Sequence, residues 1–148
     1  MEPKPTIGIT FSTFDLLHAG HIRMLADAKT QCDYLIVGLQ TDPTIDRPEK
    51  NRPTQTLVER YTQLKGCKFV DEIIPYTTEQ DLDDILRLFH IDVRIIGEEY
   101  REKEFTGKRY CEENRILLIY NSRNHRFSST GLRREVYENE CAKHLKKV

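Results

Sequence analysis

Short apolar clusters recur along the chain, with polar stretches long enough for helices between them. The clusters are rich in Ile and Val and span residues 6–11, 34–39, 69–75, 93–96 and 116–120. Runs of this length and composition are typical of buried strands. Because each run is followed by room for a helix, the pattern predicts an α/β fold: a Rossmann-like, open, parallel, five-stranded sheet with helices on both faces.

Four helices are predicted from apolar residues at helical spacing, over residues 21–29, 56–65, 79–89 and 129–143. The second of them places Leu57, Tyr61 and Leu64 on its buried face, and Gly66 follows its end. Two segments that are rich in prolines or charges, residues 41–53 and 98–108, are expected to be loops over the crevice at the carboxyl ends of the strands.

Composition limits the size and the kind of protein. A chain of 148 residues with 38% hydrophobic residues suits one core, so we expect a single domain over residues 1–148, with a frayed tail at residues 143–148. The 23 basic and 24 acidic residues give a net charge of −1, which offers no global attraction for nucleic acid or an anionic membrane. No run approaches the roughly 18 apolar residues of a membrane span, and no signal core is present, so we expect a cytoplasmic protein.

The segment between the first strand and the first helix carries the most informative polar residues. It reads Ser-Thr-Phe-Asp-Leu-Leu-His-Ala-Gly-His over residues 12–21, with His18 just before the helix and His21 in its first turn. A helix N-terminus presents unpaired N–H groups and a partial positive charge, which favour a phosphate. Two imidazoles on the same side would stabilise the charge that grows on a phosphoryl group during transfer, and one of them could protonate the bridging oxygen.

Two other interpretations of the histidine pair remain open. His18 could merely cap the helix, or the pair could be half of a metal site. The metal interpretation is disfavoured because no second pair of ligands has suitable spacing, and the four cysteines form no CxxC or CxH pair. We therefore expect no metal site formed by the protein alone.

A second candidate anion site follows the last strand. Residues 123–130 read Arg-Asn-His-Arg-Phe-Ser-Ser-Thr and open the last helix. The hydroxyls and backbone amides of Ser128, Ser129 and Thr130 suit the β and γ phosphates of a nucleotide, while Arg123 and Arg126 would supply charge-assisted bonds. The alternative is an ordinary Ser/Thr helix cap on a solvated basic turn.

Together, the two segments resemble the signatures of cytidylyltransferases of the HxGH nucleotidyltransferase superfamily, most closely the glycerol-3-phosphate type. The first family signature, G-T-F-D-x-x-H-x-G-H, is matched by Thr13, Phe14, Asp15, His18, Gly20 and His21, and the second, R-T-E-G-I-S-T-[ST], by Arg123, Ser128 and Thr130. The resemblance covers most of the chain. It departs at Ser12 and Arg126, which replace family glycines, and at Phe127, which replaces isoleucine. Ser12 would impair binding if the position needed positive φ or close approach of the nucleotide.

The resemblance implies roles for the matched positions. His18 and His21 would stabilise the α-phosphate under attack, and Ser128 to Thr130 would hold the triphosphate. The other nucleotide contacts implied are Thr13, Phe14, Asp15, Gly20, Lys50, Gly97, Glu98, Ser129 and Arg123. Arg60 and Arg126 are weaker candidates for binding the acceptor. For Arg60, Glu98 and Arg126 the alternative is a charged side chain that simply points to solvent.

The resemblance also implies a reaction. An acceptor phosphate would attack the α-phosphate of Mg²⁺-CTP in line, which gives a CDP-alcohol and pyrophosphate, with Mg²⁺ as cofactor and a homodimer as the assembly. Glycerol 3-phosphate is the expected acceptor, and choline or ethanolamine phosphate are further candidates. Other hypotheses are an adenylyltransferase that uses ATP on a phosphorylated cofactor precursor or sugar, a nucleotide-binding regulator without turnover, and, least favoured, a flavodoxin-like interaction domain.

Overall fold

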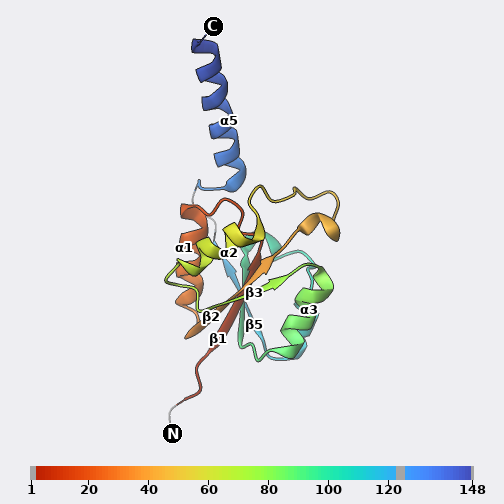
Figure 1. The fold of residues 1–148 in the computed structure, drawn as a ribbon. Coiled ribbons are helices and arrows are strands. Elements are labelled where there is room, and N and C mark those ends of the chain that lie inside the picture. The colour runs from red at the N-terminus through yellow and green to blue at the C-terminus, as the bar shows by residue number, and fades with distance from the viewer. Residues whose placement is uncertain (1–2, 123–125, 148) are drawn as a thin grey trace.

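The computed structural model describes residues 3–122 and 126–147. Five parallel strands form one sheet in the order β3-β2-β1-β4-β5, as Figure 1 shows. Their bounds are β1 Ile7–Ser12, β2 Tyr34–Gln40, β3 Glu72–Tyr76, β4 Val93–Gly97 and β5 Leu117–Asn121. From β1 in the centre the chain adds β2 and β3 on one side, then returns to add β4 and β5 on the other. The predicted α/β fold with a five-stranded parallel sheet is confirmed.

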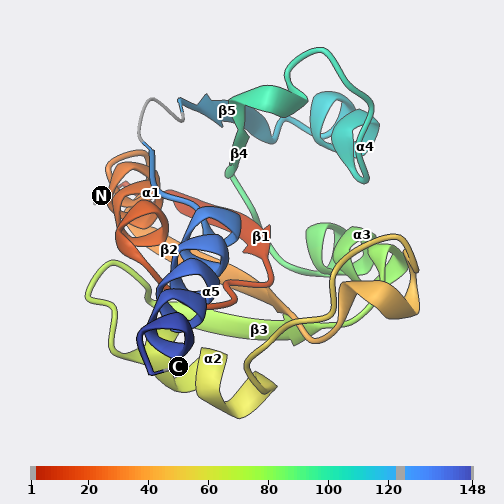
Figure 2. The same cartoon turned by 90° about the horizontal axis from the view of Figure 1, so that it is seen from above.

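Helices cover both faces of this sheet. Helices α1 (Ala19–Lys29) and α2 (Leu57–Lys65) lie on one face, while α3 (Glu79–Leu88) and α4 (Lys108–Glu113) lie on the other, as Figure 2 shows. Side chains alternate between the faces along a strand. On β2, Val37 joins the core under α1 and α2, whereas its neighbour Ile36 joins the core under α3 and α4.

Capping boxes fix where the first three helices begin. Thr56 accepts a hydrogen bond from the Glu59 amide, and the Glu59 carboxylate accepts one from the Thr56 amide. Thr78 and Asp81 form the same reciprocal pair at the start of α3. Such caps satisfy helix amides that have no partner within the helix. Two short 3₁₀ turns follow strands: η1 (Pro43–Ile45) begins three residues after the end of β2, and η2 (Glu98–Tyr100) follows β4 directly.

Three details differ from the sequence prediction. Helix α4 begins at the end of the segment expected to be a loop, after Gly107, whose φ of 82° is left-handed. On α2, Tyr61 is 37% exposed, so its predicted burial is wrong; Arg60 occupies the buried face instead. Helix α5 (Ser129–Lys146) runs three residues past the predicted Lys143.

Helix α5 stands apart from the rest of the fold. It extends beyond the carboxyl ends of the strands (Figure 1), and none of its described residues is buried. No helix in the described part of the chain is long and apolar enough to cross a membrane.

Candidate active site

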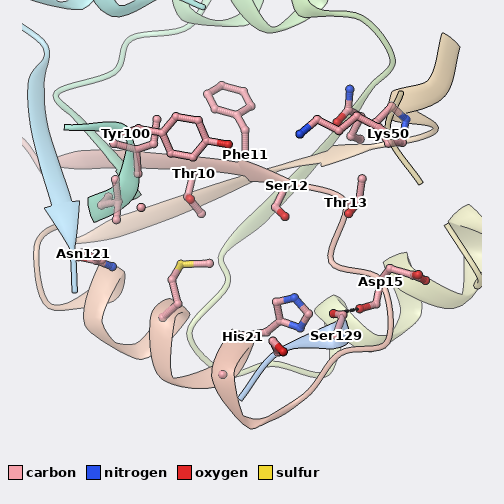
Figure 3. Close-up of a pocket in the computed structure, with 18 of the residues that line it drawn as sticks. Thr10, Phe11, Ser12, Thr13, Asp15, His21, Lys50, Tyr100, Asn121 and Ser129 are labelled. Atoms are coloured by element: carbon pink, nitrogen blue, oxygen red, sulfur yellow. Dashed lines mark hydrogen bonds between the residues drawn. The ribbon is translucent and has the colours of Figure 1, made fainter. Parts of the chain in front are cut away.

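A cleft of about 710 Å³ lies at the carboxyl ends of the strands. It opens where β1 neighbours β4, which is the point where the order of strands reverses and where open α/β sheets bind ligands. Its volume lies in the range of small-molecule sites. In Figure 3, Ser12, Thr13 and His21 border the same space, and Lys50 lies across it from His21. The cleft therefore contains residues from the predicted first signature and from the proline-rich loop.

The two histidines cap α1 and line the cleft at the same time. His18 Nδ1 accepts a hydrogen bond from the Gly20 amide at 3.0 Å, and His21 Nδ1 accepts one from the His18 amide at 3.2 Å. The rings stack, with centroids 3.9 Å apart. The capping role that the sequence left as an alternative is thus present, and it does not exclude the phosphate role.

This capping determines which ring nitrogens carry protons. A nitrogen that accepts a hydrogen bond from an amide holds no proton, so each neutral imidazole carries its proton on Nε2. The backbone consequently fixes both rings and makes both Nε2 atoms donors. Donors held rigidly beside a helix N-terminus suit an anion whose charge grows during a reaction. Among the described residues, no group of three or more His, Cys, Asp or Glu side chains is placed to hold a metal ion.

The turn between β1 and α1 has an unusual backbone. Phe14 and Leu16 have positive φ angles of 49° and 52°. The Phe14 ring is fully buried, 5.5 Å from the His21 ring, so it supports the histidine from the core and is not part of the cleft wall. Ser12 remains in the extended strand, paired with Leu39, so the family glycine is not needed there for its backbone freedom. The Ser12 side chain instead lines the cleft.

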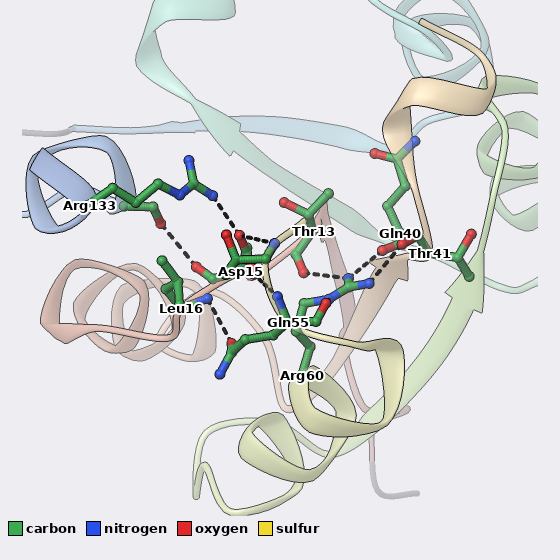
Figure 4. Close-up of polar contacts among 10 residues, drawn as sticks. Thr13, Asp15, Leu16, Gln40, Thr41, Gln55, Arg60 and Arg133 are labelled. Carbon is green, nitrogen blue, oxygen red and sulfur yellow. Dashed lines mark hydrogen bonds and ion pairs between the residues drawn. The ribbon is translucent and has the colours of Figure 1, made fainter. Parts of the chain in front are cut away.

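Asp15 joins three parts of the chain, as Figure 4 shows. Its carboxylate accepts hydrogen bonds from the amides of Thr54 and Gln55, both at 2.9 Å, and forms an ion pair with Arg133 at 2.5 Å. Burial alone would raise the pKa of this carboxyl, but the two amides and the guanidinium hold its pKa below the ordinary value. The Asp15 carbonyl also accepts a bond from Ser129 Oγ.

The second candidate anion site borders the same cleft. Ser128 caps α5 by accepting a bond from the Gly131 amide at 2.9 Å, and it lines the cleft together with Ser129 and Thr130. Phe127 also lines the cleft, whereas the Arg126 guanidinium lies over the Phe127 ring and the residue is exposed. Arg123, predicted to bind phosphate, lies outside the described residues.

The loop after β2 is held over the cleft by α3. Arg47 forms an ion pair with Glu79 at 3.0 Å, and the Asp46 carboxylate accepts a bond from the Glu79 amide. These contacts place Lys50 on the cleft wall. Lys50 is therefore positioned so that it could make the predicted contact with a nucleotide. On the opposite side of the cleft, Gly97 is a lining residue, as predicted. Glu98 is exposed and is not among the lining residues, whereas Tyr100, two residues further on, is.

Arg60 is buried beneath the cleft. It is 2% exposed, so the solvated alternative for this residue is wrong. Figure 4 shows its guanidinium donating to backbone carbonyls of Thr13 at 2.9 Å, Gln40 at 2.6 Å and Thr41 at 2.7 Å. Nε donates to the Gln55 carbonyl at 3.2 Å. Arg60 thus ties the signature turn to the end of β2, and it is not among the residues that line the cleft.

Four arginines of the described residues line the cleft, and none of them was predicted from the sequence as a site residue: Arg23, Arg47, Arg94 and Arg133. Arg133 lies one helical turn after Ser129, and this i,i+4 spacing, which puts both on one face of α5, is a signal that could have found it. Arg94, the second residue of β4, is 4% exposed and lines the cleft. Nothing in an apolar strand pattern indicates a ligand contact there.

The structure has the features that the resemblance to nucleotidyltransferases implies: an open parallel sheet, a crevice at the strand reversal, and a histidine pair at the first helix. A family model described as "Cytidylyltransferase-like" matches residues 9–135, which include both histidines and the Ser128–Thr130 segment. The chain belongs to this cytidylyltransferase-like family.

Two kinds of curated relative match at similar identity. Glycerol-3-phosphate cytidylyltransferase of Bacillus spizizenii is 35% identical over 129 residues, which are 86% of this chain and 95% of that protein. Bifunctional protein HldE of Helicobacter hepaticus is 33% identical over 139 residues, which are 93% of this chain but only 28% of HldE, so the chain spans little more than a quarter of that relative.

Solved structures share the fold. The lipopolysaccharide core biosynthesis protein from Thermoplasma volcanium superimposes with a TM-score of 0.63 at 23% identity, over 84% of this chain and 100% of that chain. Pantoate-beta-alanine ligase from Francisella tularensis gives a TM-score of 0.59 at 16% identity, over 85% of this chain and 62% of that chain.

Proposed function

We propose that this protein transfers CMP from CTP to a small phosphorylated alcohol and releases pyrophosphate, with glycerol 3-phosphate as the parent acceptor. Family membership and the 35% identity to a glycerol-3-phosphate cytidylyltransferase support the donor and the acceptor class. The observation that carries the proposal is the fixed histidine pair, which shares one cleft with the Ser128–Thr130 segment.

In the proposed reaction an oxygen of the acceptor phosphate attacks the α-phosphorus of CTP. A new P–O bond forms while the bond from the α-phosphorus to the bridging oxygen breaks, and pyrophosphate leaves with the bonding electrons. His18 and His21 donate from Nε2 to the oxygens on which charge grows, and the capping bonds at Nδ1 keep both rings in place. Thr13, Gly20 and Lys50 bind the nucleotide phosphates from the other parts of the cleft wall.

Mg²⁺ fits this site as part of the nucleotide complex. Four carboxylates line the cleft, from Asp15, Asp27, Glu79 and Glu104. Asp15 already accepts three bonds, Glu79 is paired with Arg47 and Glu104 with Lys108, so Asp27 alone of the four has no ion pair or hydrogen bond of its carboxylate among the described residues. Mg²⁺ commonly keeps several waters and binds to substrate phosphates with few protein ligands. We infer that it arrives with CTP and neutralises charge on the phosphates, while Ser128, Ser129 and Thr130 bind the β and γ phosphates.

The test is pyrophosphate release with Mg²⁺, each of the four nucleoside triphosphates, and glycerol 3-phosphate, choline phosphate, ethanolamine phosphate or FMN as the acceptor. Release with CTP and a phosphorylated alcohol is expected. The His21→Ala variant should lose turnover, whereas a matched change at the exposed His90 should not alter it. Tight CTP binding without release from any acceptor would instead indicate a nucleotide-binding regulator.

An ATP-dependent adenylyltransferase is the second candidate, because the HldE relatives match this chain about as well as the cytidylyltransferases do. The same panel separates the two: release with ATP alone would overturn CTP as the donor and leave the histidine roles unchanged. We also propose a cytoplasmic homodimer. Light scattering after size exclusion tests the assembly, and a monomer at working concentration would contradict it.

A further inference from the structure

Arg94 is a buried cation that the reaction proposed above does not use. It is the second residue of β4, is 4% exposed and lines the cleft. Its neighbours Val93 and Ile95 pack in the core under α1 and α2, so the Arg94 side chain emerges on the α3 and α4 face. The histidine pair begins α1 on the opposite face. An anion bound by Arg94 is therefore a different group from the phosphate beside the histidines.

Aromatic rings and one carbonyl hold the guanidinium in place. It lies 5.1 Å from the centroids of both the Phe11 and the Phe105 rings, and its NH1 donates to the Thr106 carbonyl at 2.5 Å. Gly107 completes this clamp, because a Cβ at that position would stand 3.1 Å from Arg94 NH1. The side chain is thus fixed at the cleft wall.

No carboxylate of the described residues forms an ion pair with this guanidinium, and its Nε is buried without a partner. Burial raises the pKa values of the nearby Tyr76 hydroxyl and Cys111 thiol, so both stay neutral at pH 7. Glu79, the one carboxylate of the described residues that acts on the pKa of Arg94, is paired with Arg47. A buried cation without a counter-anion is costly, and an anionic ligand would remove that cost.

We propose that Arg94 binds a second anionic group of the acceptor, a carboxylate or phosphate, separate from the phosphate that attacks CTP. This inference rests on the proposed function and narrows its acceptor to a phosphorylated alcohol with an additional anion. Arg94 anchors that anion on the α3 and α4 side of the sheet while the attacking phosphate lies at the histidines. An acceptor with a quaternary ammonium group is disfavoured because it would place a cation against the guanidinium.

The test compares 3-phosphoglycerate with glycerol 3-phosphate, which differ by a carboxylate in place of a hydroxymethyl group. With CTP saturating, we expect kcat/KM for 3-phosphoglycerate to exceed that for glycerol 3-phosphate by about tenfold or more. Arg94→Gln should abolish the preference by lowering only the value for 3-phosphoglycerate, and Arg94→Lys should retain part of it. Arg87→Gln is the matched control, since Arg87 also lies over an aromatic ring but is exposed and paired with Asp83.

Three outcomes overturn the inference: no preference in the wild type, an equal loss for both acceptors in Arg94→Gln, or an equal effect of Arg87→Gln. If Arg94→Gln does not fold, the wild-type preference and Arg94→Lys decide the matter. Calorimetric titration with 3-phosphoglycerate alone separates this inference from the proposed function. Binding that requires Arg94 but never leads to pyrophosphate release supports the anion site and overturns the transferase reaction.

Discussion

Replacing Asp15 with Asn tests whether the candidate site depends on a buried charge. The wild-type carboxylate is 4% exposed and accepts bonds from the Thr54 amide, the Gln55 amide and Arg133. Asn has nearly the same shape, but one acceptor oxygen becomes an NH₂ donor. That donor must face either a backbone N–H or the guanidinium, so at least one of the three bonds is lost.

The expected cost follows from these contacts. Losing a hydrogen bond to a buried charged group costs about 1.5–3 kcal/mol. The ion pair adds little, because Arg133 is one-third exposed and solvent screens it, so we assign it about 0.5 kcal/mol. The total is about 2–3.5 kcal/mol, which corresponds to a fall in Tm of about 4–14 °C for a chain of this size.

Chemical denaturation at pH 7 measures this cost against two controls. Arg133→Met removes only the ion pair and should cost about 0.5 kcal/mol, and Asp83→Asn, at an exposed helix pair, should cost no more. The gap between wild type and Asp15→Asn also depends on pH. The pKa of Asp15 is lowered in the fold, so its stabilisation is present above the ordinary value of 3.8 and is lost as pH falls through the folded value. A gap below 0.5 kcal/mol at pH 7, or one that grows toward acid pH, would refute the reasoning.

Three further variants test other parts of the site. His18→Asn keeps a side-chain oxygen for the cap but loses Nε2, so stability should stay within about 0.5 kcal/mol by thermal unfolding while turnover falls by about 100-fold or more; retained turnover would contradict the catalytic role. Arg60→Met leaves four carbonyls, one of them the buried Gln40 carbonyl, short of their donor and should lower the unfolding free energy by about 3–5 kcal/mol, which denaturant titration measures. Gly107→Ala forces a side chain into left-handed backbone beside Leu86 and should cost about 1–2 kcal/mol by the same measurement; an unchanged midpoint would be contrary to this geometry.

The sheet was predictable because its strands obey a local rule. Buried parallel strands need continuous apolar runs, and β2 is an example, with six of its seven residues buried. The cap of α1 was also predictable, since His18 and His21 lie close in sequence. By contrast, α4 follows Gly107, whose backbone is left-handed, inside a charged segment, and no apolar periodicity in the sequence predicts this helix. Local pattern therefore predicts the scaffold and the first signature well.

The interior polar residues were less predictable because their contacts are remote in sequence. Asp15 meets Arg133 across 118 positions, and Arg60 reaches Thr13 across 47. A single sequence shows charged residue types but not which of them meet. The sequence therefore predicted Arg60 as a solvated or acceptor-binding arginine, although in the folded chain its guanidinium donates to backbone carbonyls. For the same reason the sequence did not indicate a role for Arg94, because the Phe11 and Phe105 rings that contact its guanidinium lie on separate segments of the chain.

Unused hydrogen-bonding capacity separates the residues that can bind substrate from those that position them. The Asp15 carboxylate accepts hydrogen bonds from two amides and one guanidinium. Arg60 donates four of its five N–H groups to backbone carbonyls. Neither can also clamp a ligand without giving up a bond that holds the site. Their variants should therefore lose stability and turnover together, whereas a cap-preserving change at His18 should lose turnover alone. That difference in response distinguishes the positioning residues Asp15 and Arg60 from the catalytic residue His18, although all three lie in or beside the turn between β1 and α1.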